Sequence, residues 1–306
     1  MRALVVGLNW GHVHINAFRQ LGHTVMGIVD VNYEKCRSVA AQYAIENFYS
    51  SLDEVNRNDF DVITIAVPAK YHFEVINKAL NFNVPVICEK PVLGISGTDE
   101  QYRLLENKPL YFNYAYPFLE DIELFYKKID LIQNIKHIEI LCTHNLKLTT
   151  DFTDAQMFYE TVSHPVALIS HKLISQDIIA DVIKSSNDTV TALLKNGLKV
   201  DVICRKDTSF EGIRHHITIE GDKKLELIGE YLTGSTWHYK PAIFDGNYIG
   251  VEHWPSEDPW YSANKRSLNN LAEMICAKQT PDNALLKGAF DLQKAMIIEK
   301  ILHAVR

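Results

Sequence analysis

Cysteine is scarce in this sequence and never occurs as a spaced pair. The five cysteines among 306 residues are scattered, odd in number and without a C-x-x-C spacing. This distribution argues against the disulfide framework of a secreted domain and favours unpaired thiols in a reducing compartment. We therefore expect a cytoplasmic protein with free thiols at Cys36, Cys88, Cys142, Cys204 and Cys276.

Long apolar runs and basic blocks are also missing. No stretch reaches the roughly 18 to 20 consecutive apolar residues of a membrane span. The amino terminus enters a short apolar run that Gly7 ends, which is typical of a first strand and not of a signal peptide. The net charge of −7 and the absence of clustered lysine and arginine argue against nucleic acid or a membrane as a partner. What remains is a globular protein, long enough for two domains, whose partner is a small molecule.

The first 112 residues alternate strand and helix signals. The apolar runs are short and rich in β-branched residues, as strands buried on both faces are, and amphipathic stretches of helical period lie between them. This alternation predicts βαβ crossovers and a parallel sheet with helices on both faces. The runs cover residues 3–6, 25–29, 62–67, 84–88 and 110–112, and the helical stretches cover 13–21, 34–43, 73–82 and 99–106.

The alternation of predicted strands and helices ends at about residue 114. Strand-like segments at 136–142, 190–194, 198–204, 216–220 and 225–228 follow one another with hairpin-like turns. A helical period then covers 268–275, and Pro281 precedes a second predicted helix that runs to about residue 305. The predicted fold is α/β. A doubly wound, Rossmann-type dinucleotide domain covers residues 1–114, and an α+β domain with a largely antiparallel sheet covers 115–306.

The first strand-to-helix turn resembles a dinucleotide fingerprint with altered spacing. Against G-x-G-x-x-G, Gly7 fits, Asn9 replaces the second glycine, His12 replaces the third, and Gly11 stands one place early. Two explanations are open: Asn9 tolerates positive φ in a turn of normal length, or the loop is one residue shorter. A plain strand-to-helix turn without a nucleotide is the third alternative.

Asp30 ends the second predicted strand, about twenty residues after the glycines, where a carboxylate accepts hydrogen bonds from both ribose hydroxyls. Its charge repels a 2′-phosphate, so NAD(H) is favoured. Lys35 and Arg37 follow and can reach a phosphate, so NADP(H) is also possible. The alternative for Asp30 is a cap for the helix that begins near Tyr33.

Several further motifs together resemble a known family. Val67-Pro68, His72 and Cys88-Glu89-Lys90-Pro91, with Gly7, Gly11 and Asp30, resemble the glucose–fructose oxidoreductase/inositol dehydrogenase (Gfo/Idh/MocA) family over about 115 residues. The resemblance implies a Rossmann domain followed by a domain with an open sheet, which this family uses for homodimer or homotetramer contacts. It also implies hydride transfer between a nicotinamide and a hydroxyl or carbonyl carbon. His72 is expected to support its loop. The predicted cofactor-binding residues are Gly7, Asn9, Trp10, Gly11, Asp30, Val67, Pro68, His72 and Glu89.

The resemblance also carries over catalytic positions. The lysine of the family's E-K-P motif is Lys90, with a peptide bond to Pro91 that the resemblance suggests is cis. The D-x-G-x-H segment maps onto residues 160–164, so His164 takes the proton-transfer position and Glu160 that of the aspartate. The chemistry agrees, since alcohol oxidation needs a base and a neutral imidazole suits neutral pH. An ammonium stabilises alkoxide charge. If the helix begins near Thr161, Pro165 lies in its first turn.

Non-catalytic roles also stay open for these residues: Lys90 could be a solvated lysine at a strand end, and His164 could be a structural histidine. A metal site of Glu160, His164 and His171 lacks a ligand pattern, so we expect no metal. The aromatic stretches 237–239 and 254–261 would serve either to stack a sugar ring or as packing and subunit contacts.

Together these features predict an NAD(H)-dependent oxidoreductase, and the resemblance implies that its substrate is a sugar, cyclitol or nucleotide sugar. The altered glycine turn, Glu160 in place of Asp and Val162 in place of Gly leave two alternatives. One is a dinucleotide-binding regulator without catalysis, and the other is an imine reductase of the same family.

Overall fold

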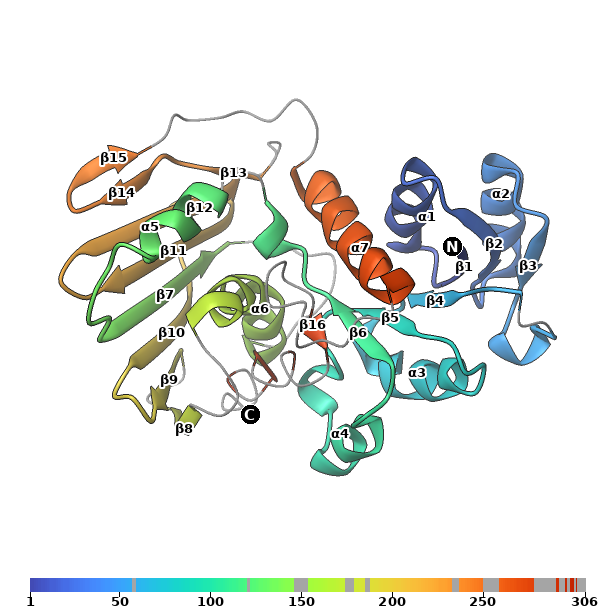
Figure 1. The fold of residues 1–306 in the computed structure, drawn as a ribbon, viewed down its shortest axis with the longest axis horizontal. Coiled ribbons are helices and arrows are strands. Elements are labelled where there is room, and N and C mark those ends of the chain that lie inside the picture. The colour runs from blue at the N-terminus through green and yellow to red at the C-terminus, as the bar shows by residue number, and fades with distance from the viewer. Residues whose placement is uncertain are drawn as a thin grey trace. The chain divides into compact units, whose positions relative to one another are not determined.

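The computed structural model describes residues 1–56, 59–119, 122–145, 154–173, 179–184, 188–232, 237–249, 259–277, 290–291, 295, 298–299 and 301. The chain divides into two compact units (Figure 1). Unit 1 comprises Met1–Ala115 and Asn264–Ala295, and unit 2 comprises Tyr116–Ala263 and Met296–Arg306.

Unit 1 contains a seven-stranded sheet with the order β16-β6-β5-β4-β1-β2-β3. Strands β1 to β6 are parallel, and β16 pairs antiparallel with β6 at the edge. Short turns of 3-10 helix, η1 (Leu52–Glu54), η2 (Ala69–Tyr71) and η3 (Gly94–Ser96), supplement the helices. The strands are β1 (Arg2–Val6), β2 (Thr24–Val29), β3 (Asn47–Tyr49), β4 (Val62–Ile65), β5 (Val86–Glu89), β6 (Leu110–Asn113) and β16 (Phe290–Asp291), and the helices are α1 (Gly11–Gln20), α2 (Tyr33–Tyr43), α3 (His72–Leu80), α4 (Asp99–Leu105) and α7 (Pro259–Ala277). The first turn of α7, before Asn264, belongs to unit 2.

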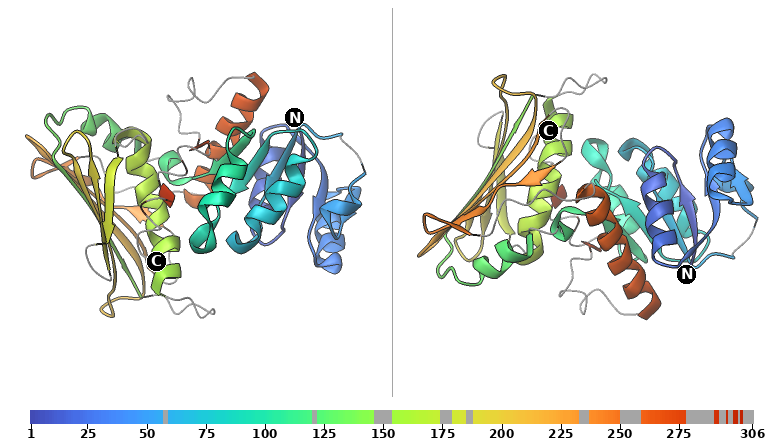
Figure 2. Two further views of the ribbon diagram at one scale, coloured as in Figure 1. Left: turned by 90° about the horizontal axis from the view of Figure 1, so that it is seen from below. Right: turned by 90° about the horizontal axis from the view of Figure 1, so that it is seen from above.

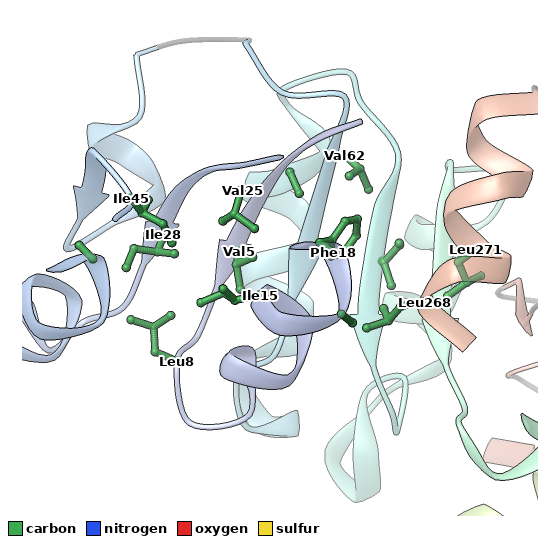
Figure 3. Close-up of a cluster of buried hydrophobic side chains, with 14 of the residues drawn as sticks. Val5, Leu8, Ile15, Phe18, Val25, Ile28, Ile45, Val62, Leu268 and Leu271 are labelled. Carbon is green, nitrogen blue, oxygen red and sulfur yellow. The ribbon is translucent and has the colours of Figure 1, made fainter. Parts of the chain in front are cut away.

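The core of unit 1 contains side chains from both ends of the sequence. Phe18 of α1 and Val62 of β4 belong to one buried cluster with Leu268 and Leu271 of α7 (Figure 3), and Met274 of α7 is a further member of this cluster. These α7 residues follow the helical period that the sequence shows. Residues Asn264–Ala295 therefore group with unit 1, although the division at residue 114 places them in the carboxy-terminal domain.

Unit 2 contains a nine-stranded mixed sheet with the order β15-β14-β12-β11-β7-β10-β9-β8, and β13 pairs with β12. Within the described part of this sheet, only the pairing of β7 with β10 is parallel. Helices α5 and α6 lie together on one face of this sheet (Figure 2), where Tyr126 Oη donates to the carbonyl of Leu168. The elements are η4 (Tyr116–Phe118), α5 (Ile122–Ile129), β7 (His137–His144), α6 (Asp154–Leu173), β8 (Ile179–Lys184), β9 (Thr189–Leu194), β10 (Lys199–Lys206), β11 (Gly212–Glu220), β12 (Lys224–Leu232), β13 (His238–Tyr239), β14 (Ala242–Phe244) and β15 (Asn247–Ile249).

The predicted fold class is confirmed, with two local corrections. Helix α6 begins at Asp154 instead of near Thr161, so Pro165 lies inside the helix and not in its first turn. The helix predicted after Pro281 does not include Phe290 and Asp291, which pair with β6 as an edge strand, because tertiary pairing overrides a local helical pattern. None of the helices in the described part of the chain combines the length and the apolar character that a membrane span requires.

Candidate cofactor and active site

A pocket of about 660 Å³ opens in unit 1 where β1, β2 and β4 end. Ligands of open α/β sheets bind at this carboxyl edge. The pocket is mostly apolar, with the carboxylate of Asp30 and the ammonium groups of Lys35 and Lys78 among its polar groups. Its lining includes Val6–Asn9, Val29–Asn32, Lys35, Ser50–Leu52, Ala66–Pro68, Tyr71, Glu74, Val75 and Lys78.

Gly7 forms the tight turn at the base of the pocket. Its φ is +87°, and a Cβ at this position would lie 2.7 Å from the carbonyl oxygen of Ala66, so only glycine fits. Gly11 is the first residue of α1, where a Cβ would lie 3.1 Å from Val5 Cγ1. Asn9 does not adopt positive φ, and His12 lies within the helix. The structure therefore supports the loop that is one residue shorter, with Gly11 allowing close packing of helix on strand.

The carboxylate of Asp30 is fixed by the backbone around it. Oδ2 accepts a hydrogen bond of 2.8 Å from the amide of Leu8, and Oδ1 accepts one of 3.0 Å from the amide of Asn32. The cap of α2 is Asn32, whose side chain accepts from the amide of Lys35, so Asp30 is not the helix cap. Lys35 Nζ lies 3.8 Å from Asp30 Oδ2.

These residues fit a dinucleotide. The glycine turn leaves room that a Cβ would fill, the amino terminus of α1 follows it, and a held carboxylate lies at the end of β2. Two exposed hydrophobic side chains, Val31 and Tyr71, also line the pocket, with exposed fractions of 93% and 46%. No motif predicts either residue, although the position of Val31 directly after Asp30 is a usable signal.

The other predicted cofactor-binding residues divide into two groups. Val67 and Pro68 line the pocket with Gly7, Asn9 and Asp30, whereas Trp10, Gly11, His72 and Glu89 do not. His72 is fully buried. Its Nε2 lies 2.9 Å from the carbonyl oxygen of Val67 and its Nδ1 lies 2.8 Å from that of Pro91. Burial lowers the pKa of His72, and the carbonyl contacts oppose this effect. His72 therefore supports the loop.

Lys90 directly follows β5, whose neighbour β4 carries the pocket-lining loop of Val67 and Pro68. The side chain is half-buried, and the peptide bond to Pro91 is cis, as the resemblance suggests.

In unit 2, His164 lies on α6 in a cluster of aromatic rings. Its imidazole centroid is 4.8 Å from the ring of Trp260 and 5.9 Å from that of Tyr116, and Trp237 packs on Trp260 at 5.6 Å. His164 and Trp260 are half-buried, whereas Tyr116 and Trp237 are buried. Trp237 from the first aromatic stretch and Trp260 from the second thus both belong to the cluster of rings that contains His164.

The side chains of Glu160 and His171 lie outside the described part of the structure. Among the described residues, no group of three or more histidine, cysteine or acidic side chains is placed to hold a metal ion. Lys90 belongs to unit 1 and His164 to unit 2, and their approach to one another stays a prediction.

Unit 1 is thus defined by its sheet and its pocket as a dinucleotide-binding α/β unit. Residues 1–116 match the model of an oxidoreductase family with an NAD-binding Rossmann fold, Gfo/Idh/MocA. The predicted resemblance to this family is confirmed over these residues.

Similar proteins agree with this assignment. Inositol 2-dehydrogenase 1 of Paenarthrobacter aurescens is 26% identical over 178 residues, which are 54% of this chain and 51% of that protein. The chain thus spans about half the length of the curated relatives that it matches.

Two solved structures share the fold over nearly the whole chain. A myo-inositol dehydrogenase from Corynebacterium glutamicum has a TM-score of 0.70 at 19% identity, covering 99% of this chain and 96% of that one. A levoglucosan dehydrogenase in complex with NADH has a TM-score of 0.73 at 12% identity, covering 100% and 96%.

Proposed function

We propose that the protein is an NAD(H)-dependent oxidoreductase that interconverts a hydroxyl and a carbonyl group on a sugar or cyclitol ring. The observation that carries the proposal is the position of Lys90. An ammonium group follows β5 at the same sheet edge where the neighbouring strands end in a pocket that fits a dinucleotide. The family assignment supports nicotinamide chemistry, and the carboxylate of Asp30 favours NAD(H) over NADP(H).

Each residue has a distinct role in this proposal. A bound nicotinamide would supply the hydride-transfer chemistry. Gly7 lets the pyrophosphate approach the backbone at the start of α1, and Asp30 accepts hydrogen bonds from the ribose hydroxyls. Lys90 stabilises the negative charge that develops on the substrate oxygen. His164 takes the hydroxyl proton in the oxidative direction and returns it in reduction, with Glu160 supporting it.

The substrate class is argued from the surroundings of His164. The half-buried ring of Trp260 packs against the imidazole, and an aromatic face beside a catalytic base suits the C–H face of a pyranose or cyclitol. The names of the relatives, inositol 2-dehydrogenase and levoglucosan dehydrogenase, point to the same class. They favour neither of the alternatives, an imine reductase or a non-catalytic regulator.

The test is replacement of Lys90 by Met, assayed with inositols, pyranoses, nucleotide sugars and a cyclic imine, with NAD⁺, NADH and their phosphorylated forms. Loss of the ammonium should lower kcat by about 10²- to 10³-fold, because one stabilising group at a developing oxyanion contributes on the order of 3–4 kcal/mol. The dissociation constant for NADH should change by less than about threefold, since the ribose and pyrophosphate contacts lie elsewhere.

Lys108→Met is the matched control, because Lys108 is an exposed lysine of the same unit and lines no part of the pocket. It should retain full turnover. Undiminished turnover by Lys90→Met would contradict the proposal. Turnover of the imine alone would select the imine reductase, and NADH binding without turnover of any substrate would select the regulator.

A further inference from the structure

A buried polar network lies directly beneath the E-K-P segment of unit 1. Glu89 Oε1 lies 2.8 Å from His14 Nε2 and accepts a hydrogen bond of 2.6 Å from Asn113 Nδ2. Asn113 Nδ2 also donates to Asn264 Oδ1 at 2.7 Å, and His14 Nδ1 is hydrogen-bonded to Thr64 Oγ1. The network joins helix α1, strands β4, β5 and β6 and helix α7 within this one unit.

The hydrogen-bond pattern fixes which atom donates and which accepts. Asn113 faces two oxygen acceptors, the Glu89 carboxylate and the Asn264 side-chain oxygen, so its nitrogen must point toward them. The carboxylate of Glu89 only accepts, so His14 donates from Nε2. In the neutral imidazole, Nδ1 then accepts from the hydroxyl of Thr64. One carboxylate oxygen therefore receives two N–H donors.

The burial of this network indicates that it has a role other than stabilising the fold. His14 and Thr64 are fully buried, Asn113 is 1% exposed, and the side chain of Glu89 is 12% exposed. Polar and ionic groups at such a depth are no better for stability than well-packed apolar residues. They do fix a unique geometry when they are paired, and here the donors of His14, Thr64 and Asn113 have acceptors, whereas Asn113 Oδ1 has no hydrogen-bond partner among the described residues.

A second buried histidine holds the other side of the same segment. His72 lies 2.8 Å from the carbonyl oxygen of Pro91 and 3.1 Å from that of Val92 through Nδ1. Lys90 is thus the residue between two anchored neighbours, with Glu89 held through its side chain and Pro91 through its backbone.

We propose that His14 and Glu89 are positioning residues for Lys90: their hydrogen bond, with Thr64 and Asn113, fixes the backbone from which the ammonium group projects. The inference rests on the proposed function of Lys90 and adds a role for a helix-α1 histidine outside the pocket. Neither His14 nor Glu89 lines that pocket. Their loss should therefore change the chemical step more than the binding of nucleotide or substrate.

The experiment compares two pairs of variants, His14→Leu with His14→Gln and Glu89→Leu with Glu89→Gln. The leucine variants remove the hydrogen bond, and the glutamine variants retain a donor at position 14 or an acceptor oxygen at position 89. We expect both leucine variants to lower kcat by about 20- to 100-fold, as misplacement of a catalytic group does. KM and the dissociation constant for NADH should stay within about threefold. Each glutamine variant should have a kcat at least fivefold higher than that of the leucine variant at the same position.

His23→Leu is the matched control, because His23 is a half-buried histidine of the same unit whose ring contacts Phe18 and the amino terminus. It should retain the wild-type kcat. If His14→Leu does not fold, the isosteric Thr64→Val tests the same hydrogen-bond chain and should lower kcat by about three- to tenfold.

The outcomes separate the inference from the proposed function. If Lys90→Met abolishes turnover while the leucine variants and Thr64→Val keep the wild-type kcat, the network only stabilises the fold and the inference is wrong. If the glutamine variants recover none of the lost kcat at either position, the hydrogen bond does not position Lys90, and the inference is also overturned. If Lys90→Met itself retains turnover, the proposed function is wrong.

Discussion

At the scale of single residues, the proposed preference for NAD(H) depends on the carboxylate of Asp30. Both of its oxygens already accept backbone amides, from Leu8 and Asn32, so the carboxylate cannot rotate away from the pocket. A carboxylate oxygen has two lone-pair directions, which leaves each oxygen one further acceptor site for a ribose hydroxyl. The 2′-phosphate of NADP(H) would instead meet a fixed negative charge.

We expect Asp30→Asn to weaken NADH binding by about 10- to 100-fold, because a charge-assisted hydrogen bond contributes on the order of 1.5–3 kcal/mol. NADPH binding should weaken less or improve, because the repulsion is removed while Lys35 stays within reach. Titration of nucleotide fluorescence measures both affinities. Glu34→Gln removes an exposed charge nearby, where Glu34 pairs with Arg37 at 2.7 Å, and should change neither affinity by more than twofold. An unchanged preference in Asp30→Asn would contradict the role of Asp30.

Individual residues were predictable where a motif gives them a fixed place. The positions of Gly7, Asp30 and Lys90 follow from spacing along the strands, because the carboxyl ends of parallel strands meet at one sheet edge. His14 has no such position, and the place of Asn113 at the end of β6 does not reveal which residues it contacts. The hydrogen bonds that they form with Glu89 join residues 75 and 24 positions away, and only the folded sheet brings these residues together.

At the scale of secondary structure, buried strands were predictable and edges were not. Strands β1, β4 and β5 are almost wholly buried and appear as continuous apolar runs. Edge strands β3 and β16, of three and two residues, leave too little pattern to recognise. Helix α7 was found from its period, but its packing into unit 1 depends on contacts that local sequence does not encode.

Strand β11 places His215 in an unusual environment. The imidazole is buried under Trp237, with ring centroids 4.8 Å apart, and its Nδ1 lies 3.1 Å from Tyr116 Oη. Burial lowers the pKa of His215 to about 3, and an interaction with the backbone of Thr161 opposes this shift. Pro165 lies four residues after Thr161 and has no N–H for the helical bond to that carbonyl, which leaves the carbonyl oxygen free for His215.

The lowered pKa predicts a stability that depends on pH. The unfolded chain binds a proton at His215 near pH 6.5, whereas the folded chain does so only near pH 3. The contribution is therefore fully present above pH 6.5 and is lost as the pH falls. The free energy of unfolding should fall by roughly 3 kcal/mol between pH 6.5 and pH 4 from this group alone, at about 1.4 kcal/mol per pH unit.

Urea unfolding at several pH values measures this effect. His215→Gln removes the titrating group, so its unfolding free energy should fall less steeply over this range than that of the wild type. His216→Gln, on the opposite face of the same strand, should keep the wild-type slope. Equal slopes in all three proteins would show that His215 is protonated without cost and would contradict the burial argument.

At the scale of the whole molecule, the sheet of unit 2 has one face without a covering helix among the described residues. Helices α5 and α6 lie on the other face. A row of half-buried side chains crosses four strands of the open face in register: Ile203 lies opposite Leu141, Leu141 opposite His216, and His216 opposite Ile228. Three of these four side chains are aliphatic, which is unusual for a sheet face in contact with water only.

We propose that a second copy of the chain covers this row, so that the protein is a homodimer or a homotetramer. Sedimentation velocity should then give a species of at least twice the chain mass at micromolar concentration.

Leu141→Glu introduces a charge that would lie at the centre of the interface without a partner, so it should weaken association by about 100-fold or more. Leu104→Glu is the control, because Leu104 is 55% exposed on α4 of unit 1 and lies outside the row. A wild-type protein that sediments as a monomer, or a Leu141→Glu variant that associates normally, would contradict the proposal. Either result would mean that the aliphatic row tolerates water, and the paired charges beside it, such as Lys199 with Asp201 at 2.7 Å, would then suffice to solvate the face.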